Sequence, residues 1–166
     1  MLRCSITKYT NGELLRMKVT HKIITWEDRL KLGIPLVDSQ HEHLIQITNN
    51  LHLACQRDTA TANNHFIYTA HEAVRYVRYH FYTEEQLMLR FGFPEFSSHK
   101  KEHDVFSREV LKVTKNFSGE KRLVPNRFVA FLKEWVLSHI PVCDREMTEF
   151  IIGEAARRKK LAALSA

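Results

Sequence analysis

Two pairs of candidate metal ligands lie close together in the middle of the sequence. His80 and Glu84 are four residues apart, and so are His99 and His103. Side chains four residues apart share one face of a helix, with Cβ atoms about 5–6 Å apart, so each pair can bind one metal ion or two adjacent ions. The Gly-Phe-Pro segment at 92–94 is typical of one helix ending and another beginning. We therefore expect two antiparallel helices with both pairs facing inward, as in metal sites built inside helical bundles.

Three more residues, His41, His139 and Asp144, extend this set to seven. On a continuous helix, the spacing between His139 and Asp144 would turn their side chains apart. Pro141 disrupts a regular helix between them, which allows Asp144 to return toward the same point. A single buried histidine is more often a hydrogen-bonded core residue than a ligand. Five histidines and two carboxylates at bundle-compatible positions favour a site for two metal ions.

Long amphipathic segments are needed to position these residues. We expect four main helices, at about 38–55, 62–91, 97–116 and 125–139, and a short C-terminal helix from about 144. In the third segment, His99 and His103 occupy positions of a heptad seam that are otherwise apolar. The short connections between segments favour an all-α, up-down-up-down four-helix bundle.

The first residues of the chain differ in character from the rest. Asn11 and Gly12 are the favoured pair for a type I′ turn, and the flanking residues suit strands. We expect an N-terminal β-hairpin extension at 1–23, with a frayed tail as the alternative, because an isolated hairpin is marginal in water. Edge pairing of two hairpins would make a homodimer; otherwise the protein is a monomer. The bundle domain is expected at 24–153, with a basic C-terminal tail at 154–166.

Composition narrows the class of protein further. The chain has 166 residues and a net charge of +6, without a motif or a basic-aromatic pattern typical of nucleic-acid binding. The basic run at 157–160 is interpreted as a solvated last helical turn rather than a contact with a polyanion or a membrane. Cys4, Cys55 and Cys143 are scattered, which is typical of reduced thiols in the cytoplasm. We expect neither a signal peptide nor a membrane span.

Together, these motifs resemble the hemerythrin family of non-haem di-iron oxygen-binding proteins, including its bacterial single-domain members. The resemblance covers about residues 24–152 and rests on the following runs: His41, His80-Phe81-x-x-Glu84-Glu85, His99-x-x-x-His103 and His139-Ile140-x-x-x-Asp144. Further matches are Trp26, Gly33-Ile34-Pro35, Asp38, Gln40, Leu87-Met88 and Trp135.

The resemblance implies a role for each of the seven residues. One iron ion would be held by His99, His103 and His139. The second would be held by His41 and His80, with an open position for dioxygen. Glu84 and Asp144 would bridge the two iron ions, together with an oxo or hydroxo group from solvent.

The residue types agree with this reading on chemical grounds. Imidazole suits iron, and carboxylates can bridge two cations. Five neutral donors and two carboxylates leave two iron(II) ions with a net charge of about +2. Such a histidine-rich site should favour iron(II), and hence reversible oxygen binding over oxygenation.

Apolar residues next to the ligands are expected to form the wall of an oxygen pocket. These are Leu44, Phe81, Met88, Trp135, Val136 and Ile140. A dry wall denies protons and anions to the bound ligand. The same residues would also serve as ordinary bundle core.

We therefore expect an oxygen-binding protein, not an enzyme, that serves storage, delivery or sensing. Three alternatives remain open: a di-iron enzyme acting on peroxide or nitric oxide, an oxygen- or redox-responsive signalling module, and a structural, zinc or manganese bundle. Dioxygen is the expected partner, with no nucleic acid and no membrane.

Overall fold

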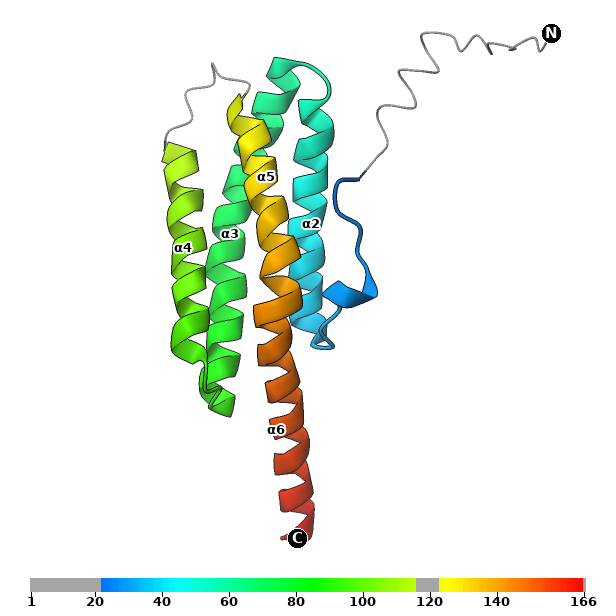
Figure 1. Ribbon diagram of the computed structural model, residues 1–166, viewed down its shortest axis with the longest axis vertical. Coiled ribbons are helices and arrows are strands. Elements are labelled where there is room, and N and C mark those ends of the chain that lie inside the picture. Colours follow the sequence, from blue (N-terminus) through cyan, green and yellow to red (C-terminus); the bar gives the residue numbers. More distant parts are fainter. Residues whose placement is uncertain (1–21, 116–122, 166) are drawn as a thin grey trace, which may run out of the picture.

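Four long helices lie side by side and form the body of the molecule (Figure 1). The structure is a computed structural model that describes residues 22–115 and 123–165. The four helices are α2 (Pro35–Cys55), α3 (Thr59–Phe91), α4 (Phe96–Lys115) and α5 (Leu123–Ser138). Each runs opposite to the one before it, and α2 packs against both α3 and α5 (Figure 1). The predicted up-down-up-down helical bundle is confirmed for the described residues.

The boundaries of α3 follow from its end residues. Asp58 caps the N-terminus, where its side chain accepts a hydrogen bond of 2.8 Å from the backbone N–H of Thr61. At the other end, Gly92 adopts the left-handed conformation with φ of 74° and donates its N–H to the carbonyl of Met88. A side chain rarely tolerates that conformation, so glycine ends the helix there.

The start of α2 corrects the expected boundary. Pro35 begins the helix, three residues before the expected start at about 38, because proline lacks only an N–H that is unbonded in a first turn anyway. Asp38 accepts the backbone N–H groups of Leu32 at 2.8 Å and Gly33 at 3.0 Å. It thereby fixes the loop that leads into α2.

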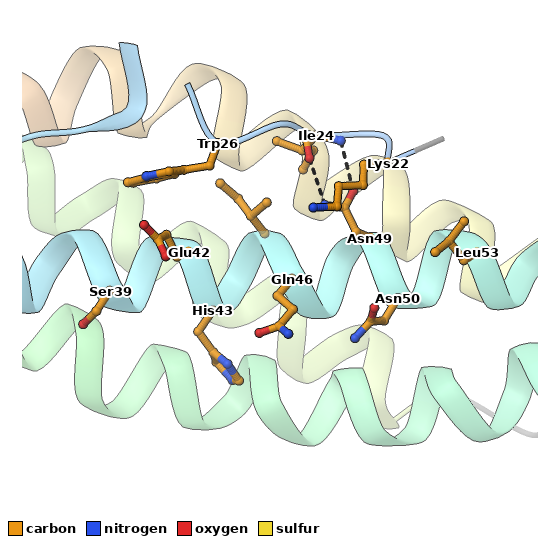
Figure 2. A pocket seen from close by; sticks show the side chains of 11 residues that line it. Lys22, Ile24, Trp26, Ser39, Glu42, His43, Gln46, Asn49, Asn50 and Leu53 are labelled. Atoms are coloured by element: carbon orange, nitrogen blue, oxygen red, sulfur yellow. Dashed lines mark hydrogen bonds between the residues drawn. The ribbon is translucent and has the colours of Figure 1, made fainter. Parts of the chain in front are cut away.

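The segment before α2 lies along the bundle as an arm and contains the short 3-10 turn η1 (Asp28–Leu30). Asn49 of α2 ties this arm down (Figure 2). Its side-chain oxygen accepts from the backbone N–H groups of Ile23 at 2.9 Å and Ile24 at 3.0 Å. Its amide donates to the carbonyl of Ile24 at 2.8 Å. Asn49 is buried, so these three bonds satisfy backbone groups that water reaches poorly.

Replacing Asn49 with alanine is expected to destabilise the protein by about 2 kcal/mol, because it leaves buried backbone groups without partners. For a chain of this size, that loss lowers the midpoint of thermal unfolding by about 4–8 °C. The matched control is Asn50→Ala, which changes an exposed neighbour on the same helix. Equal midpoints for the two variants would contradict the role of Asn49.

The C-terminal helix is longer than expected. After a five-residue π turn, η2 (Ile140–Asp144), α6 runs from Arg145 to Leu164 and extends beyond the end of the bundle (Figure 1). The basic run at 157–160 is helical, as expected, but it lies before the last turn of α6, which holds no basic residue. Glu154 pairs with Arg157 at 2.6 Å and Arg158 at 2.9 Å, which supports the helix at this point. Arg158 also donates to the carbonyls of Arg90 and Phe91, so it caps the C-terminal end of α3.

Two other expectations concern the remainder of the chain. The N-terminal hairpin, and the homodimer built on it, fall on residues 1–21, which lie outside the described residues, and stay predictions. Within 22–115 and 123–165, the chain forms helices and turns but no strand. None of the helices described is long and apolar enough to cross a membrane.

Candidate metal centre

All seven predicted ligands meet inside the bundle. They come from α2, α3, α4, the end of α5 and the π turn η2, and none of them is more than 4% exposed. The seven residues are His41, His80, Glu84, His99, His103, His139 and Asp144. Their ligand atoms form two adjacent groups, each with all its atoms within 4.8 Å of one another.

The first group combines three histidines with Asp144. The Nε2 atoms of His99 and His103 are 3.0 Å apart. The Asp144 Oδ1 atom lies 3.0 Å from Nε2 of His139 and 3.2 Å from Nε2 of His99. These atoms surround a point that a cation can occupy.

The second group combines two histidines with both carboxylates. The Nε2 atoms of His41 and His80 are 3.1 Å apart. Glu84 Oε1 lies 3.3 Å from Nε2 of His80, and Asp144 Oδ2 lies 3.2 Å from Nε2 of His41.

Each carboxylate divides its two oxygens between the groups. Asp144 directs Oδ1 to the first group and Oδ2 to the second. Glu84 directs Oε1 to His80, while its Oε2 lies 3.2 Å from Nε2 of His103 in the first group. Two carboxylates shared in this way are the arrangement needed to bridge a pair of metal ions.

Unpaired buried atoms test whether metal ions fit here. Both oxygens of Glu84, both oxygens of Asp144 and the Nε2 atom of His139 are buried without a hydrogen-bond partner in the described part of the chain. Buried polar atoms are nearly always paired, so such a concentration needs an explanation. Metal ions at about 2.0–2.2 Å from these nitrogen and oxygen atoms would pair them. The residues therefore fit the two iron ions that the motifs imply.

The charges of the group agree with this fit. Burial and the nearby Asp144 oppose the charged form of Glu84, but the histidines outweigh both and hold its pKa below the usual range. Burial likewise disfavours the charged form of Asp144, but His139 outweighs it and holds the pKa of Asp144 well below the usual range. Both residues are therefore carboxylates at neutral pH.

The histidines divide into protonated and neutral members. Burial lowers the pKa of His80 to about 3. Burial also opposes the charged forms of His99 and His139, but the carboxylates outweigh it and raise their pKa to about 9 and about 11. Without metal, protons on His99 and His139 therefore compensate part of the carboxylate charge.

The π turn η2 explains how Asp144 reaches the centre. A break in the helix was expected at Pro141, but the helix instead continues as a wider turn. Within it, the N–H of Asp144 donates to the carbonyl of His139 at 3.2 Å. In a π turn, residues five apart lie on one face. His139 and Asp144 therefore point to the same place.

A second layer of polar side chains orients the histidine rings. Gln40 Oε1 lies 2.9 Å from Nδ1 of His80, and Glu102 Oε2 lies 2.7 Å from Nδ1 of His139. An acceptor on Nδ1 leaves Nε2 free to bind metal and raises its basicity. Glu102 was missed by the sequence analysis, because its contact joins α4 to the end of α5 and leaves no local pattern.

Replacing Glu102 with glutamine is expected to weaken iron binding about tenfold, because His139 loses a charged acceptor for its Nδ1–H. Competition with a chelator, followed by metal analysis, measures this change. Glu109→Gln is the control, since Glu109 lies on the same helix but contacts only Lys112 among the ion pairs described. An iron affinity equal to that of the control would contradict the orienting role.

Aromatic rings cover the histidines. Phe81 stacks on His103 with ring centroids 3.8 Å apart, and Trp135 stacks on His139 at the same distance. Tyr76, which the sequence analysis also missed, stacks on His80 at 4.3 Å. It lies one helical turn before His80, and that spacing was the available signal.

The predicted wall residues do not all lie in one cluster. Leu44, Phe81, Val136 and Ile140 are buried in the main core, with Trp135 packed against it. Met88 instead belongs to a second cluster with Phe93, Met147 and Ile151. Met88 is buried as expected, but it faces different neighbours.

The fold and the two ligand groups together define a helical-bundle protein for a pair of metal ions. The family model described as the hemerythrin HHE cation binding domain matches residues 32–151. The chain therefore belongs to the hemerythrin family, whose members hold two non-haem iron ions and bind oxygen there.

Individual relatives support this assignment. A bacteriohemerythrin of Stenotrophomonas maltophilia is 33% identical over 119 residues, which cover 71% of this chain and 74% of the relative. A bacteriohemerythrin of Pseudomonas aeruginosa is 34% identical over 118 residues, which cover 70% of this chain and 74% of the relative. The crystal structure of a wild-type hemerythrin superposes with a TM-score of 0.62 at 26% identity, covering 78% of this chain and 98% of that one.

Proposed function

We propose that the protein binds dioxygen reversibly at its di-iron centre, for storage, delivery or sensing. The observation that carries this proposal is the sharing of Glu84 and Asp144, each with one oxygen toward each ligand group. We assign His99, His103 and His139 to one iron ion, and His41 and His80 to the other. When bound, the two iron ions supply electrons and a coordination place for the oxygen molecule.

The uneven division of the histidines supports an assignment of that place. Both carboxylates face both groups, but three histidines lie in one group and two in the other, so the ion at His41 and His80 would have one protein donor fewer. We therefore assign the open position to the side of His41 and His80.

The surrounding side chains keep this place dry. Leu44, Val136 and Ile140 are fully buried, and Phe81 is 3% exposed. Apolar walls exclude water and dissolved anions, so an oxygen molecule can be released chemically unchanged. The stacked rings of Phe81 and Trp135 also restrict rotation of His103 and His139.

Anaerobic reduction followed by exposure to air tests the proposal. Visible absorption should rise with air, disappear on degassing and return over several cycles. His80→Ala should abolish the response, whereas His43→Ala should not, because His43 is exposed and pairs with Glu72. Irreversible oxidation on first contact with air, or rapid turnover of hydrogen peroxide or nitric oxide, would overturn oxygen carriage in favour of an enzyme.

A further inference from the structure

Tyr76 lies against the ligand group to which we assign the open position. Its ring stacks on the imidazole of His80 with centroids 4.3 Å apart and planes inclined by 24°. It also makes edge contacts with Phe81 at 5.5 Å and Phe106 at 6.2 Å, and is only 5% exposed. The ring is therefore held within the wall of the proposed oxygen pocket.

The hydroxyl group of Tyr76 is unusual. It is buried, and it has no hydrogen-bond partner in the described part of the chain. The indole Nε1 of Trp135 is also buried without a partner there. Burying an unpaired hydroxyl is unfavourable, and phenylalanine would fill the same space without that cost.

The hydroxyl of Tyr76 interacts electrostatically with the two shared carboxylates. Burial raises the pKa of Tyr76 well above its usual value, and the negative charges of Asp144 and Glu84 raise it further. The Trp135 side chain opposes these effects. The charges of both carboxylates therefore act on this hydroxyl.

We propose that the Tyr76 hydroxyl is a hydrogen-bond donor to the ligand at the open coordination place. This inference rests on the proposed function. The ring is stacked on a histidine of the iron ion with fewer donors, and its O–H has no protein acceptor among the described residues. The pocket then selects ligands that carry a hydrogen-bond acceptor, such as dioxygen or a small anion, over ligands that are apolar throughout.

The variant Tyr76→Phe tests this role, because it keeps the ring and its stacking but removes the donor. The probe is azide, titrated into the oxidised, iron-loaded protein. We expect the dissociation constant for azide to rise about tenfold, as for the loss of a hydrogen bond to a charged acceptor. Tyr79→Phe is the matched control, since Tyr79 lies on the same helix and is 66% exposed.

Thermal unfolding of the iron-loaded proteins without azide provides the second measurement. If the hydroxyl serves the ligand, Tyr76→Phe should keep or raise the unfolding midpoint, because no bond within the protein is lost. If the hydroxyl instead serves the fold, the midpoint should fall by several degrees while azide affinity stays within twofold of the wild type. That result would overturn the proposal.

Two further outcomes separate this inference from the proposed function. Failure of Tyr76→Phe to hold two iron ions would overturn the donor role, because the hydroxyl would then serve assembly of the centre. The wild-type protein could fail the oxygen test while Tyr76→Phe still binds azide about tenfold more weakly than the wild type. That pair of results would refute oxygen carriage but support the role of Tyr76 as a hydrogen-bond donor.

Discussion

Replacing Asp144 with asparagine is expected to leave the protein unable to hold two iron ions. The carboxylate oxygens of Asp144 lie 3.0 Å from His139, 3.2 Å from His99 and 3.2 Å from His41, across both ligand groups. Asparagine has nearly the same shape, but it is neutral and offers one oxygen instead of two. The net charge of the iron(II) centre would rise from about +2 to about +3 in a buried place.

Metal analysis of the purified variant measures this effect. We expect the iron content to fall from two ions per chain to fewer than one, with the helical content preserved by circular dichroism. The control is Asp104→Asn, which removes an exposed carboxylate of α4 that pairs with Lys100. Two iron ions in the Asp144→Asn protein would refute the bridging assignment.

Iron loading is expected to depend steeply on pH. The pKa of His99 is raised to about 9 and that of His139 to about 11, so both carry a proton at pH 7 in the metal-free protein. A histidine must release that proton before its nitrogen can bind metal. Iron binding then displaces two protons, and the apparent affinity should rise about 100-fold between pH 7 and pH 8.

The metal-free protein should respond to pH in the opposite direction. A raised pKa adds stability that is fully present below the ordinary histidine value near 6.5, and this stability is lost as the pH rises through about 9 and then about 11. The same two protons therefore favour the metal-free folded state at low pH and the loaded state at high pH.

Chelator competition at pH 7 and pH 8, under anaerobic conditions, measures the change in affinity. Proton release in weakly buffered solution gives an independent count. His80 should contribute no proton, because its pKa is lowered to about 3 and it is already neutral. An affinity that is independent of pH would refute the proton displacement at His99 and His139.

The amino-acid sequence alone determined the local features of this protein. The spacing of His80 and Glu84, and of His99 and His103, indicated which faces of two helices turn inward. The end of α3 near Gly92 was also predicted, because a glycine there acts within a single turn of the chain. Helical spacing and helix ends depend on residues three or four apart, so they can be read without a tertiary structure.

Beyond the seven ligands, the tertiary structure decided which residues meet across helices. The bond between Glu102 and His139, the edge contact of Tyr76 with Phe106 and the separate cluster of Met88 join different helices. The π turn that brings Asp144 back was likewise expected as a break rather than a widened turn. Such contacts depend on the rotation and axial position of each packed helix. Those quantities are set by the whole core at once, and no short stretch of sequence carries them.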